Sequence, residues 1–294
     1  MTKIRGIFAA SMSILNEDLS LNTEKTIKHA EKLIDQGCHG TAIFGSTGQA
    51  QLISVSEKIN LLNKLSDSKY KDKHLIGTGM NSLSETINYI KIAISLNLKK
   101  FLIMPPAYYK YKDAEVIEFY SKIVETVPES QIVLYNFEKL CGYKFSLECV
   151  KTLATRYPNQ IIGIKDSTYN IFENLKLENF SIFPGSELKL SKGLELGCSG
   201  IITATCNATA QLSRKVYDDF MTSKDLLHDQ KLKKVRSVFD RYNLISALHA
   251  FYSKEDKIYK NILPPLRVLN KEEEKDLFDS LDNLNFTLKS QLAA

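Results

Sequence analysis

The sequence of 294 residues has no tryptophan, and its five cysteines form no C-x-x-C pair. An odd number of cysteines cannot pair completely within one chain, so we expect buried thiols in a reducing cytoplasm and no disulfide scaffold. The five histidines show neither H-x-H nor H-E-x-x-H spacing, which leaves no local metal signature. A zinc enzyme is therefore not expected.

Excess charge of one sign is also lacking, because 39 Lys and Arg residues stand against 34 Asp and Glu residues without a long basic cluster. We therefore expect no non-specific binding to nucleic acid or to anionic membranes. No stretch approaches the roughly 18 to 20 apolar residues of a membrane span. Lys3 and Arg5 precede an apolar run that weakly resembles a signal peptide, but the run contains two serines, and we interpret it as a first strand.

The pattern that is present consists of short apolar, β-branched runs separated by amphipathic segments with helical spacing. Eight such runs favour a closed barrel over an open doubly wound sheet, in which five to seven strands are usual. We therefore predict an α/β fold, a (β/α)8 TIM barrel. The expected strands are 4–11, 40–45, 74–79, 100–106, 131–137, 161–167, 180–185 and 200–207.

Helix signals lie between these runs. Thr23 is a plausible N-cap for a helix that stops at Gly37, and Ser54 and Glu57 have the spacing of a capping box. The alternation ends after residue 207, and charge-rich helical sequence follows, broken at Pro264-Pro265. We expect a barrel domain at 1–222 and a C-terminal helical extension at 223–294, with the charged helix faces in solvent.

Lys165 ends the sixth expected strand, on the same face as Gly163, which would leave room for a ligand. A lysine that faces the barrel interior is partly desolvated, and desolvation disfavours the ammonium form. An uncharged amine can attack a carbonyl and form a Schiff base. The alternative is that Lys165 begins the loop and points to water.

Tyr135 ends the fifth expected strand, and neighbouring strands are about 4.8 Å apart, so its phenol would reach an amine on the sixth strand. Tyrosine serves as a general acid and base, although an interior tyrosine is also common in simple packing. Ser46 and Thr47 stand between glycines at the end of the second expected strand. This turn is suited to a carboxylate, but the same sequence is also an ordinary tight turn.

Five segments occur in order over residues 4 to 222: FGSTGQA, MPPAYYK, LYNF, GIKDS and SGIITATCN. Together they resemble the pyruvate-dependent class I aldolase family, which contains N-acetylneuraminate lyase, 2-keto-3-deoxygluconate aldolase and dihydrodipicolinate synthase. The resemblance implies an imine between Lys165 and pyruvate or another 2-keto acid, with Tyr135 moving protons. It implies that Ser46 and Thr47 hold the carboxylate and that Thr47 relays protons to Tyr135. No metal or diffusible cofactor is required.

The resemblance also implies a homotetramer built from tight dimers. Tyr108 is similar to the family's tyrosine that enters the neighbouring subunit's site, although Tyr109 competes for this assignment. Ile202 resembles the residue whose backbone faces the bound keto acid. The implied partner is a small 2-keto acid, not a nucleic acid or a membrane.

Two positions after Tyr135 depart from the family pattern. Glu138 stands where the family usually has proline, and we expect it either to reshape this loop or to add a charge at the mouth of the site. Leu140 stands where synthases of the lysine pathway carry an arginine for the second substrate's carboxylate. An uncharged leucine cannot replace that bidentate fork.

The lyase branch is matched better but incompletely. Gly185 and Glu187 stand where that branch uses polar groups for sugar hydroxyls, whereas Leu188 and Ala204 replace an acidic residue and a hydroxyl. We therefore predict a Schiff-base lyase that cleaves a 2-keto-3-deoxy sugar acid, or a related 4-hydroxy-2-keto acid, to pyruvate and an aldehyde. The alternatives are a dihydrodipicolinate synthase that condenses pyruvate with aspartate semialdehyde, or a non-catalytic keto-acid-binding barrel.

Overall fold

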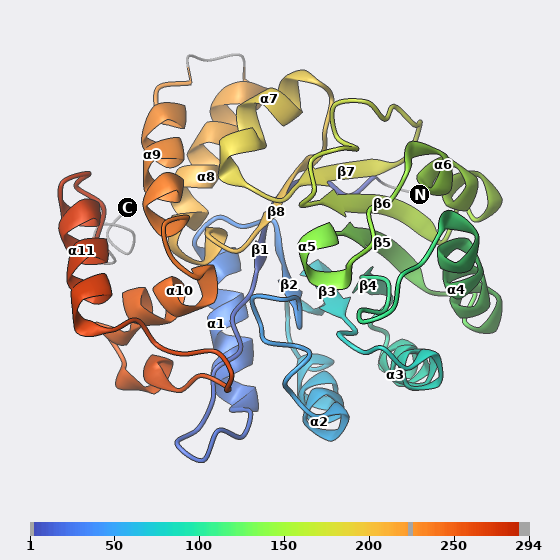
Figure 1. Ribbon diagram of the computed structural model, residues 1–294, viewed down its shortest axis with the longest axis horizontal. Coiled ribbons are helices and arrows are strands. Elements are labelled where there is room, and N and C mark those ends of the chain that lie inside the picture. Colours follow the sequence, from blue (N-terminus) through green and yellow to red (C-terminus); the bar gives the residue numbers. More distant parts are fainter. Residues whose placement is uncertain (1–2, 223–225, 288–294) are drawn as a thin grey trace.

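Eight short parallel strands form the centre of the molecule (Figure 1). The computed structural model describes residues 3–222 and 226–287. The strands pair in the order β7-β6-β5-β4-β3-β2-β1-β8, and the Ser199 backbone N–H donates to the Ile182 carbonyl at 2.8 Å where β7 meets β8. The predicted TIM barrel is confirmed. Each strand lies within its expected range: β1 (Gly6–Ala10), β2 (Gly40–Ile43), β3 (His74–Gly77), β4 (Lys100–Ile103), β5 (Gln131–Asn136), β6 (Ile161–Asp166), β7 (Ser181–Pro184) and β8 (Gly200–Thr203).

Helices surround the strands, as the alternating pattern predicted. The barrel helices are α1 (Thr23–Asp35), α2 (Val55–Leu65), α3 (Leu83–Ser95), α4 (Asp113–Thr126), α5 (Glu138–Cys141), α6 (Leu147–Arg156), α7 (Leu190–Glu195) and α8 (Cys206–Met221). Single 3-10 turns are η1 (Lys71–Lys73), η2 (Glu187–Lys189) and η3 (Lys257–Lys260). The described segment 167–180, between β6 and β7, contains no assigned helix and departs from strict alternation.

The helix ends follow local hydrogen-bonding chemistry. The predicted capping box at α2 is confirmed, because the Ser54 and Glu57 side chains accept from each other's backbone N–H. The predicted N-cap of α1 is wrong by one residue. Asn22 caps the helix, with its side-chain oxygen accepting from the Lys25 N–H at 2.9 Å, and Thr23 is the first helical residue.

The hydrophobic core has three parts, one inside the barrel and two between the strands and the surrounding helices. The interior is filled by side chains from the strands: Phe8, Ala42, Leu75, Leu102, Val133, Tyr135, Phe183 and Ile202. All five cysteines are free and buried, as predicted. The carboxyl ends of the strands therefore stand on a packed base, where the side chains of the last residues are free to face a ligand.

Three further helices follow the barrel: α9 (Asp229–Phe239), α10 (Leu244–Ser253) and α11 (Lys271–Asp282). They pack beside α8 and β1 in one shared hydrophobic cluster, and they lie together at one side of Figure 1. The division at residue 222 stays a prediction, and residues 223–225 and 288–294 of the expected extension lie outside the described residues.

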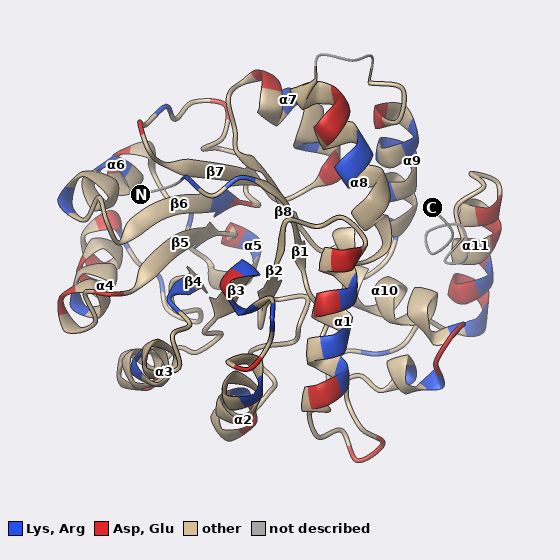
Figure 2. Cartoon of the chain, turned by 180° about the vertical axis from the view of Figure 1, so that it is seen from behind, with Lys and Arg blue, Asp and Glu red and all other residues tan. Residues whose placement is uncertain are grey.

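Charged residues are distributed over the helices around the barrel (Figure 2). The N-terminal apolar run forms β1, which agrees with its interpretation as a strand. Among the described helices, none combines the length and apolar character that crossing a membrane requires.

Candidate active site

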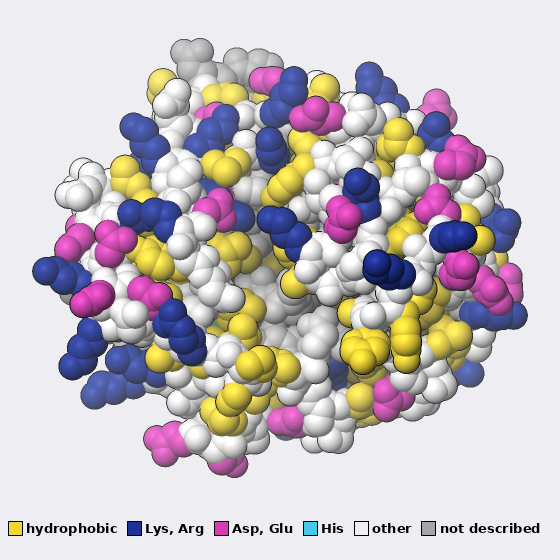
Figure 3. Space-filling model, in the orientation of Figure 1, with side chains coloured by type: hydrophobic (Ala, Val, Ile, Leu, Met, Phe, Trp, Pro, Cys, Tyr) yellow, Lys and Arg dark blue, Asp and Glu magenta, His cyan; other side chains and the backbone are white. Residues whose placement is uncertain are grey.

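A cavity of about 690 Å³ opens at the carboxyl ends of the strands. Figure 3 shows it as a hollow near the middle of this face of the molecule. Residues from β5, β6 and the loops after β2, β6, β7 and β8 line it, together with residues of α5, α9 and α10. This is the end of a TIM barrel at which enzymes of this fold place their active sites.

Lys165 and Tyr135 form the centre of the site. They are direct register partners on β6 and β5, and their side chains are only 3% and 4% exposed. The Lys165 Nζ lies 4.2 Å from the centre of the Tyr135 ring, and both residues line the cavity. The alternative in which Lys165 points to bulk water is therefore wrong. Within the described chain Lys165 makes no ion pair, so its amine has no carboxylate counter-ion.

The next residue on β6 explains how this strand end is fixed. The buried Asp166 carboxylate accepts from the backbone N–H groups of Tyr169, Ile171 and Phe172 at 2.8–3.0 Å. It also accepts from the Asn136 amide of β5 at 2.8 Å. Both carboxylate oxygens thus shape the loop after β6, and Asp166 forms no ion pair with Lys165 among the described residues.

The sequence indicated that Gly163 leaves room for a ligand beside Lys165, but the structure shows another role for this glycine. A Cβ at Gly163 would lie 2.4 Å from the Ser181 carbonyl oxygen of β7, so this glycine allows close packing of two strands. Gly185 at the end of β7 does line the cavity, and a Cβ there would lie 2.2 Å from the Ser167 hydroxyl.

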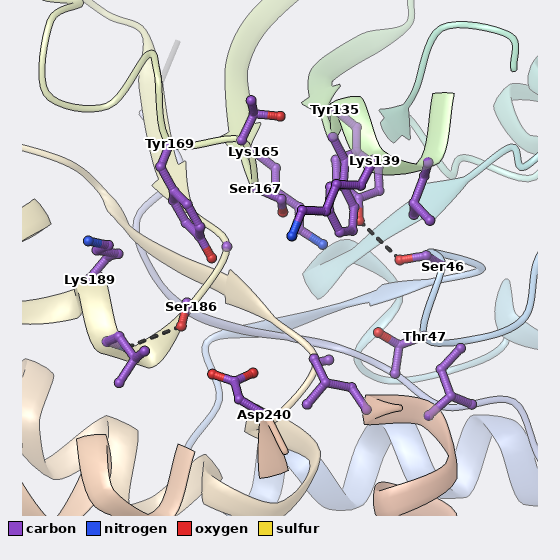
Figure 4. Close-up of a pocket in the computed structure, with 18 of the residues that line it drawn as sticks. Ser46, Thr47, Tyr135, Lys139, Lys165, Ser167, Tyr169, Ser186, Lys189 and Asp240 are labelled. Carbon is purple, nitrogen blue, oxygen red and sulfur yellow. Dashed lines mark hydrogen bonds between the residues drawn. The ribbon is translucent and has the colours of Figure 1, made fainter. Parts of the chain in front are cut away.

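The turn after β2 brings two hydroxyl groups to the cavity. The Ser46 Oγ lies 3.0 Å from the Tyr135 hydroxyl (Figure 4). Thr47 is buried and lines the cavity, but within the described residues it makes no hydrogen bond to Tyr135. The residue that contacts the phenol is therefore Ser46, whereas the resemblance implied a relay through Thr47.

The geometry of this turn leaves backbone donors available. Gly48 allows the chain to pass close to the loop after β1, because a Cβ there would lie 2.9 Å from the Ser11 carbonyl oxygen. The Ser13 hydroxyl donates to the Gly48 carbonyl at 2.7 Å and fixes the turn. No hydrogen bond among the described residues uses the backbone N–H of Ser46 or Thr47. These two donors suit an anion such as a carboxylate.

Glu187 was expected to bind sugar hydroxyls, but it does not line the cavity. Its side chain is fully buried in η2 and accepts from Arg236 Nη1 at 2.8 Å, Thr203 Oγ1 at 2.8 Å and Thr209 Oγ1 at 3.1 Å. With its oxygens satisfied in this way, the carboxylate is not free to bind sugar hydroxyls, and it instead positions Arg236. Burial alone would lower the pKa of Arg236, but Glu187 and Asp240 outweigh that effect and raise it.

The remaining predicted residues divide between the cavity and other places. Leu140, Leu188 and Ala204 line the cavity with Gly185. Ile202 is fully buried inside the barrel. Tyr108 does not line the cavity of its own chain: it is 89% exposed, with a left-handed φ of 91°, and its ring contacts that of Tyr109 edge-on at 5.2 Å.

Comparisons with known proteins settle which family has this arrangement. The model of the dihydrodipicolinate synthetase family matches residues 3–284. The chain belongs to this family. A relative from Chloroflexus aurantiacus, named an uncharacterized DapA-like lyase, is 28% identical over 283 residues, which cover 93% of this chain and 94% of the relative.

Two further similarities are informative. A Picrophilus torridus protein named 2-dehydro-3-deoxy-D-gluconate/2-dehydro-3-deoxy-phosphogluconate aldolase is 24% identical over 231 residues, covering 76% of this chain and 85% of the relative. The crystal structure of YagE from E. coli K12, described as a prophage protein of the same family in complex with pyruvate, has a TM-score of 0.83 and 23% identity and covers 96% of this chain and 99% of YagE. The protein is a class I aldolase or lyase of the dihydrodipicolinate synthetase family.

The C-terminal helices of this family member contribute residues that the sequence did not indicate. Arg236 of α9, Asp240 directly after this helix and Asn243 before α10 line the cavity, as does Tyr169 of the loop after β6. Burial raises the pKa of Tyr169, although Arg236 opposes this. The i,i+4 spacing of Arg236 and Asp240 predicts an ion pair, but nothing in the sequence relates α9 to the barrel mouth. No cluster of three metal-ligating side chains occurs in the described residues.

Proposed function

We propose that this enzyme reversibly cleaves a 2-keto-3-deoxy sugar acid, or a related 4-hydroxy-2-keto acid, to pyruvate and an aldehyde. The observation that carries the proposal is the buried Lys165 amine, without a counter-ion, beside the Tyr135 phenol in a cavity. The name of the Picrophilus relative and the pyruvate in the YagE structure support the same chemistry.

The first step is imine formation. The uncharged Lys165 amine attacks the C2 carbonyl of the keto acid, and loss of water gives a protonated imine. The backbone N–H groups of Ser46 and Thr47 hold the substrate carboxylate and thereby orient C2 toward the amine. Tyr135 supplies a proton to the departing water, and its hydrogen bond with Ser46 keeps the phenol in place.

The second step breaks the carbon–carbon bond. The C4 hydroxyl gives its proton to the Tyr135 phenolate while the C3–C4 bonding electrons move into the imine, which becomes an enamine and releases the aldehyde. Tyr135 then returns a proton to C3, and water hydrolyses the imine to pyruvate and free Lys165. The protonated imine stabilises the electron pair left on C3, so this mechanism uses no metal or diffusible cofactor.

The activity is tested by cleavage assays in which pyruvate release is followed during incubation with 2-keto-3-deoxygluconate and its phosphate. We expect pyruvate from at least one compound, and its complete loss in Lys165→Ala. A panel of 4-hydroxy-2-keto acids that releases no pyruvate would contradict the proposal.

The second candidate is the condensation of pyruvate with aspartate semialdehyde. The family model favours it, whereas Leu140, which lines the cavity without a charge, opposes it. The same preparation assayed with pyruvate and aspartate semialdehyde separates the two activities. Turnover there that exceeds sugar-acid cleavage would show that another residue replaces the missing arginine.

We also infer a cytoplasmic homotetramer built from tight dimers, in which Tyr108 completes the neighbouring subunit's site. The exposed Tyr108 and Tyr109 rings support an interface, and the five free thiols support a reducing compartment. Mixing inactive Lys165→Ala with Tyr108→Phe subunits, followed by subunit exchange, should restore activity above that of either variant. Sedimentation of the active enzyme as a monomer would contradict this assembly.

A further inference from the structure

We propose that Gln49 is a positioning residue, which connects the C-terminal helices to the turn whose backbone N–H groups bind the substrate carboxylate. This inference rests on the proposed function, because it concerns how that carboxylate is held beside Lys165. Gln49 is 2% exposed and does not line the cavity. It therefore acts on the substrate through its neighbours Ser46 and Thr47, which do line it.

The backbone of Gln49 determines the shape of this turn. Its φ of 55° lies in the left-handed region, which residues with a side chain seldom adopt. Its N–H donates to the Ser46 carbonyl at 3.0 Å. The Ser46 carbonyl and the Thr47 N–H belong to one planar peptide group and point in opposite directions. The bond from Gln49 therefore fixes the direction of the Thr47 N–H, one of the two donors proposed for the carboxylate.

The side-chain amide of Gln49 is held by the C-terminal part of the chain. Its Oε1 accepts from the Leu263 N–H at 2.9 Å, and its Nε2 lies 3.4 Å from the Nε2 of His249 in α10. Burial lowers the pKa of His249 to about 4, so the ring is neutral at neutral pH. Its Nδ1 lies 2.6 Å from the Tyr259 carbonyl, which only accepts. Nδ1 therefore carries the proton, and Nε2 accepts from the Gln49 amide.

The two partners of this amide belong to segments that are attached to the barrel and to the cavity wall. Leu244 and Ile245, at the start of α10, line the cavity. Leu263 follows Asn261, whose side-chain amide donates to the Leu15 carbonyl in the loop after β1 at 3.0 Å. The C-terminal helices thus hold the turn in place relative to the cavity wall, and the substrate carboxylate meets donors that are already oriented.

This arrangement predicts an effect that depends on the carboxylate. Loss of the Gln49 amide releases the turn, whereas Lys165 and Tyr135 keep their places as partners on β6 and β5. Figure 4 shows Ser46 and Thr47 on the side of the cavity opposite to Tyr169. A keto acid therefore binds less well after this loss, while a ketone without a carboxylate reacts with Lys165 as before.

The test compares pyruvate with acetone, which lacks the carboxylate, in borohydride trapping on Lys165. Peptide mass spectrometry gives the rate constant of modification for each compound, and the ratio of the two constants measures the contribution of the carboxylate. Gln49→Met retains the length of the side chain but removes its amide. We expect it to lower the ratio about 10-fold or more, through the pyruvate rate alone. The matched control is Gln51→Met at an exposed position of the same loop, with an unchanged ratio.

Two substitutions of His249 test the same contact from the other side, and they decide the matter if Gln49→Met does not fold. In His249→Asn the amide nitrogen takes the place of Nδ1 and keeps the bond to the Tyr259 carbonyl, but the acceptor for Gln49 is lost. In His249→Gln the amide oxygen takes the place of Nε2, so that acceptor is kept and the Tyr259 bond is lost. We expect the ratio to fall in His249→Asn and to stay within about twofold of the wild type in His249→Gln.

An unchanged ratio in Gln49→Met, or equal ratios in the two His249 variants, would overturn the inference. The proposed function survives that result if pyruvate is trapped on Lys165 of the wild type and a keto acid is cleaved. Absence of trapping in the wild type would overturn both. Trapping with the expected ratios, but without cleavage of any keto acid, would overturn the proposed function alone.

Discussion

At the scale of single residues, access to the cavity distinguishes two buried lysines. Lys58 of α2 is 1% exposed, and burial lowers its pKa to about 8. Its ammonium donates to the Thr78 carbonyl at 3.0 Å and does not line the active-site cavity. Lys165 is similarly buried but faces the cavity beside Tyr135. Burial alone therefore does not make a lysine a nucleophile, because the amine must also meet the substrate.

The hydroxyl of Tyr135 carries the proton transfers in this account. Tyr135→Phe retains the ring that packs beside Lys165 but removes the only proton donor and acceptor of that side chain. We expect kcat to fall by about 10² to 10⁴, with an unchanged thermal unfolding midpoint. Steady-state kinetics of pyruvate release check this.

The matched control for that variant is Tyr143→Phe. The Tyr143 hydroxyl donates to Asp113 at 2.7 Å, and Tyr143 is not among the residues that line the cavity. We expect its turnover to stay near the wild-type value. A similar loss in both variants would show that the effect is structural.

The geometry of parallel strands made Lys165 and Tyr135 predictable from the sequence. Lys165 and Tyr135 end consecutive strands, and the period of two residues together with parallel pairing makes them neighbours. The same reasoning could not predict Glu187, because it stands in a turn after β7 where no periodicity fixes the direction of a side chain. The Glu187 carboxylate points away from the cavity because it accepts a hydrogen bond from Arg236 of α9.

At the scale of elements, the Glu187–Arg236 pair connects η2 to α9. Both side chains are at most 7% exposed, so loss of one partner leaves a charge in a poorly solvated place. We expect Glu187→Gln to lower the free energy of unfolding by about 3 kcal/mol. Chemical denaturation at neutral pH measures the change.

An exposed ion pair provides the comparison. Lys25 and Asp256 lie 2.8 Å apart, and both side chains are 46% exposed. Lys25→Gln should cost less than about 1 kcal/mol, because solvent screens this pair. Equal effects of the two substitutions would contradict the assigned importance of the buried pair.

The elements themselves were largely predictable because a buried parallel strand is a short apolar run bounded by turns. The cap of α1 was missed by one residue, since Asn22 and Thr23 are both capping residues and only the backbone conformation distinguishes them. The contribution of α9 to the site was missed because the pattern of an amphipathic, charged helix predicts that its charged residues face solvent. Arg236 is nevertheless buried against the barrel.

At the scale of the whole molecule, buried histidines join the C-terminal helices to the barrel. The His29 ring lies between the Tyr259 hydroxyl and the Asn207 side chain, each at 2.9 Å, and the His249 Nδ1 lies 2.6 Å from the Tyr259 carbonyl. Burial lowers the pKa of both histidines to about 4. Both rings are therefore neutral in the folded protein at neutral pH.

This predicts a loss of stability in acid. An unfolded histidine takes up a proton near pH 6.5, while these two take one up only near pH 4, so the unfolded state binds more protons between those values. The stabilisation is complete above pH 6.5 and declines as the pH falls to about 4. Each histidine contributes about 3 kcal/mol to that loss.

Urea unfolding between pH 7 and pH 4 measures this dependence. His29→Gln should reduce the slope of unfolding free energy against pH by about 1 kcal/mol per pH unit, whatever its effect at pH 7. The same slope in the wild type and in His29→Gln would contradict the prediction.

The identity of the amine that captures the keto acid is the central claim, and reductive trapping tests it most directly. The enzyme is incubated with pyruvate and borohydride, digested, and analysed by peptide mass spectrometry. The account predicts that the reduced pyruvate adduct forms on Lys165 and that the equally buried Lys58 stays unmodified. An adduct on Lys58, or none on Lys165 under conditions that label an authentic class I aldolase, would contradict it.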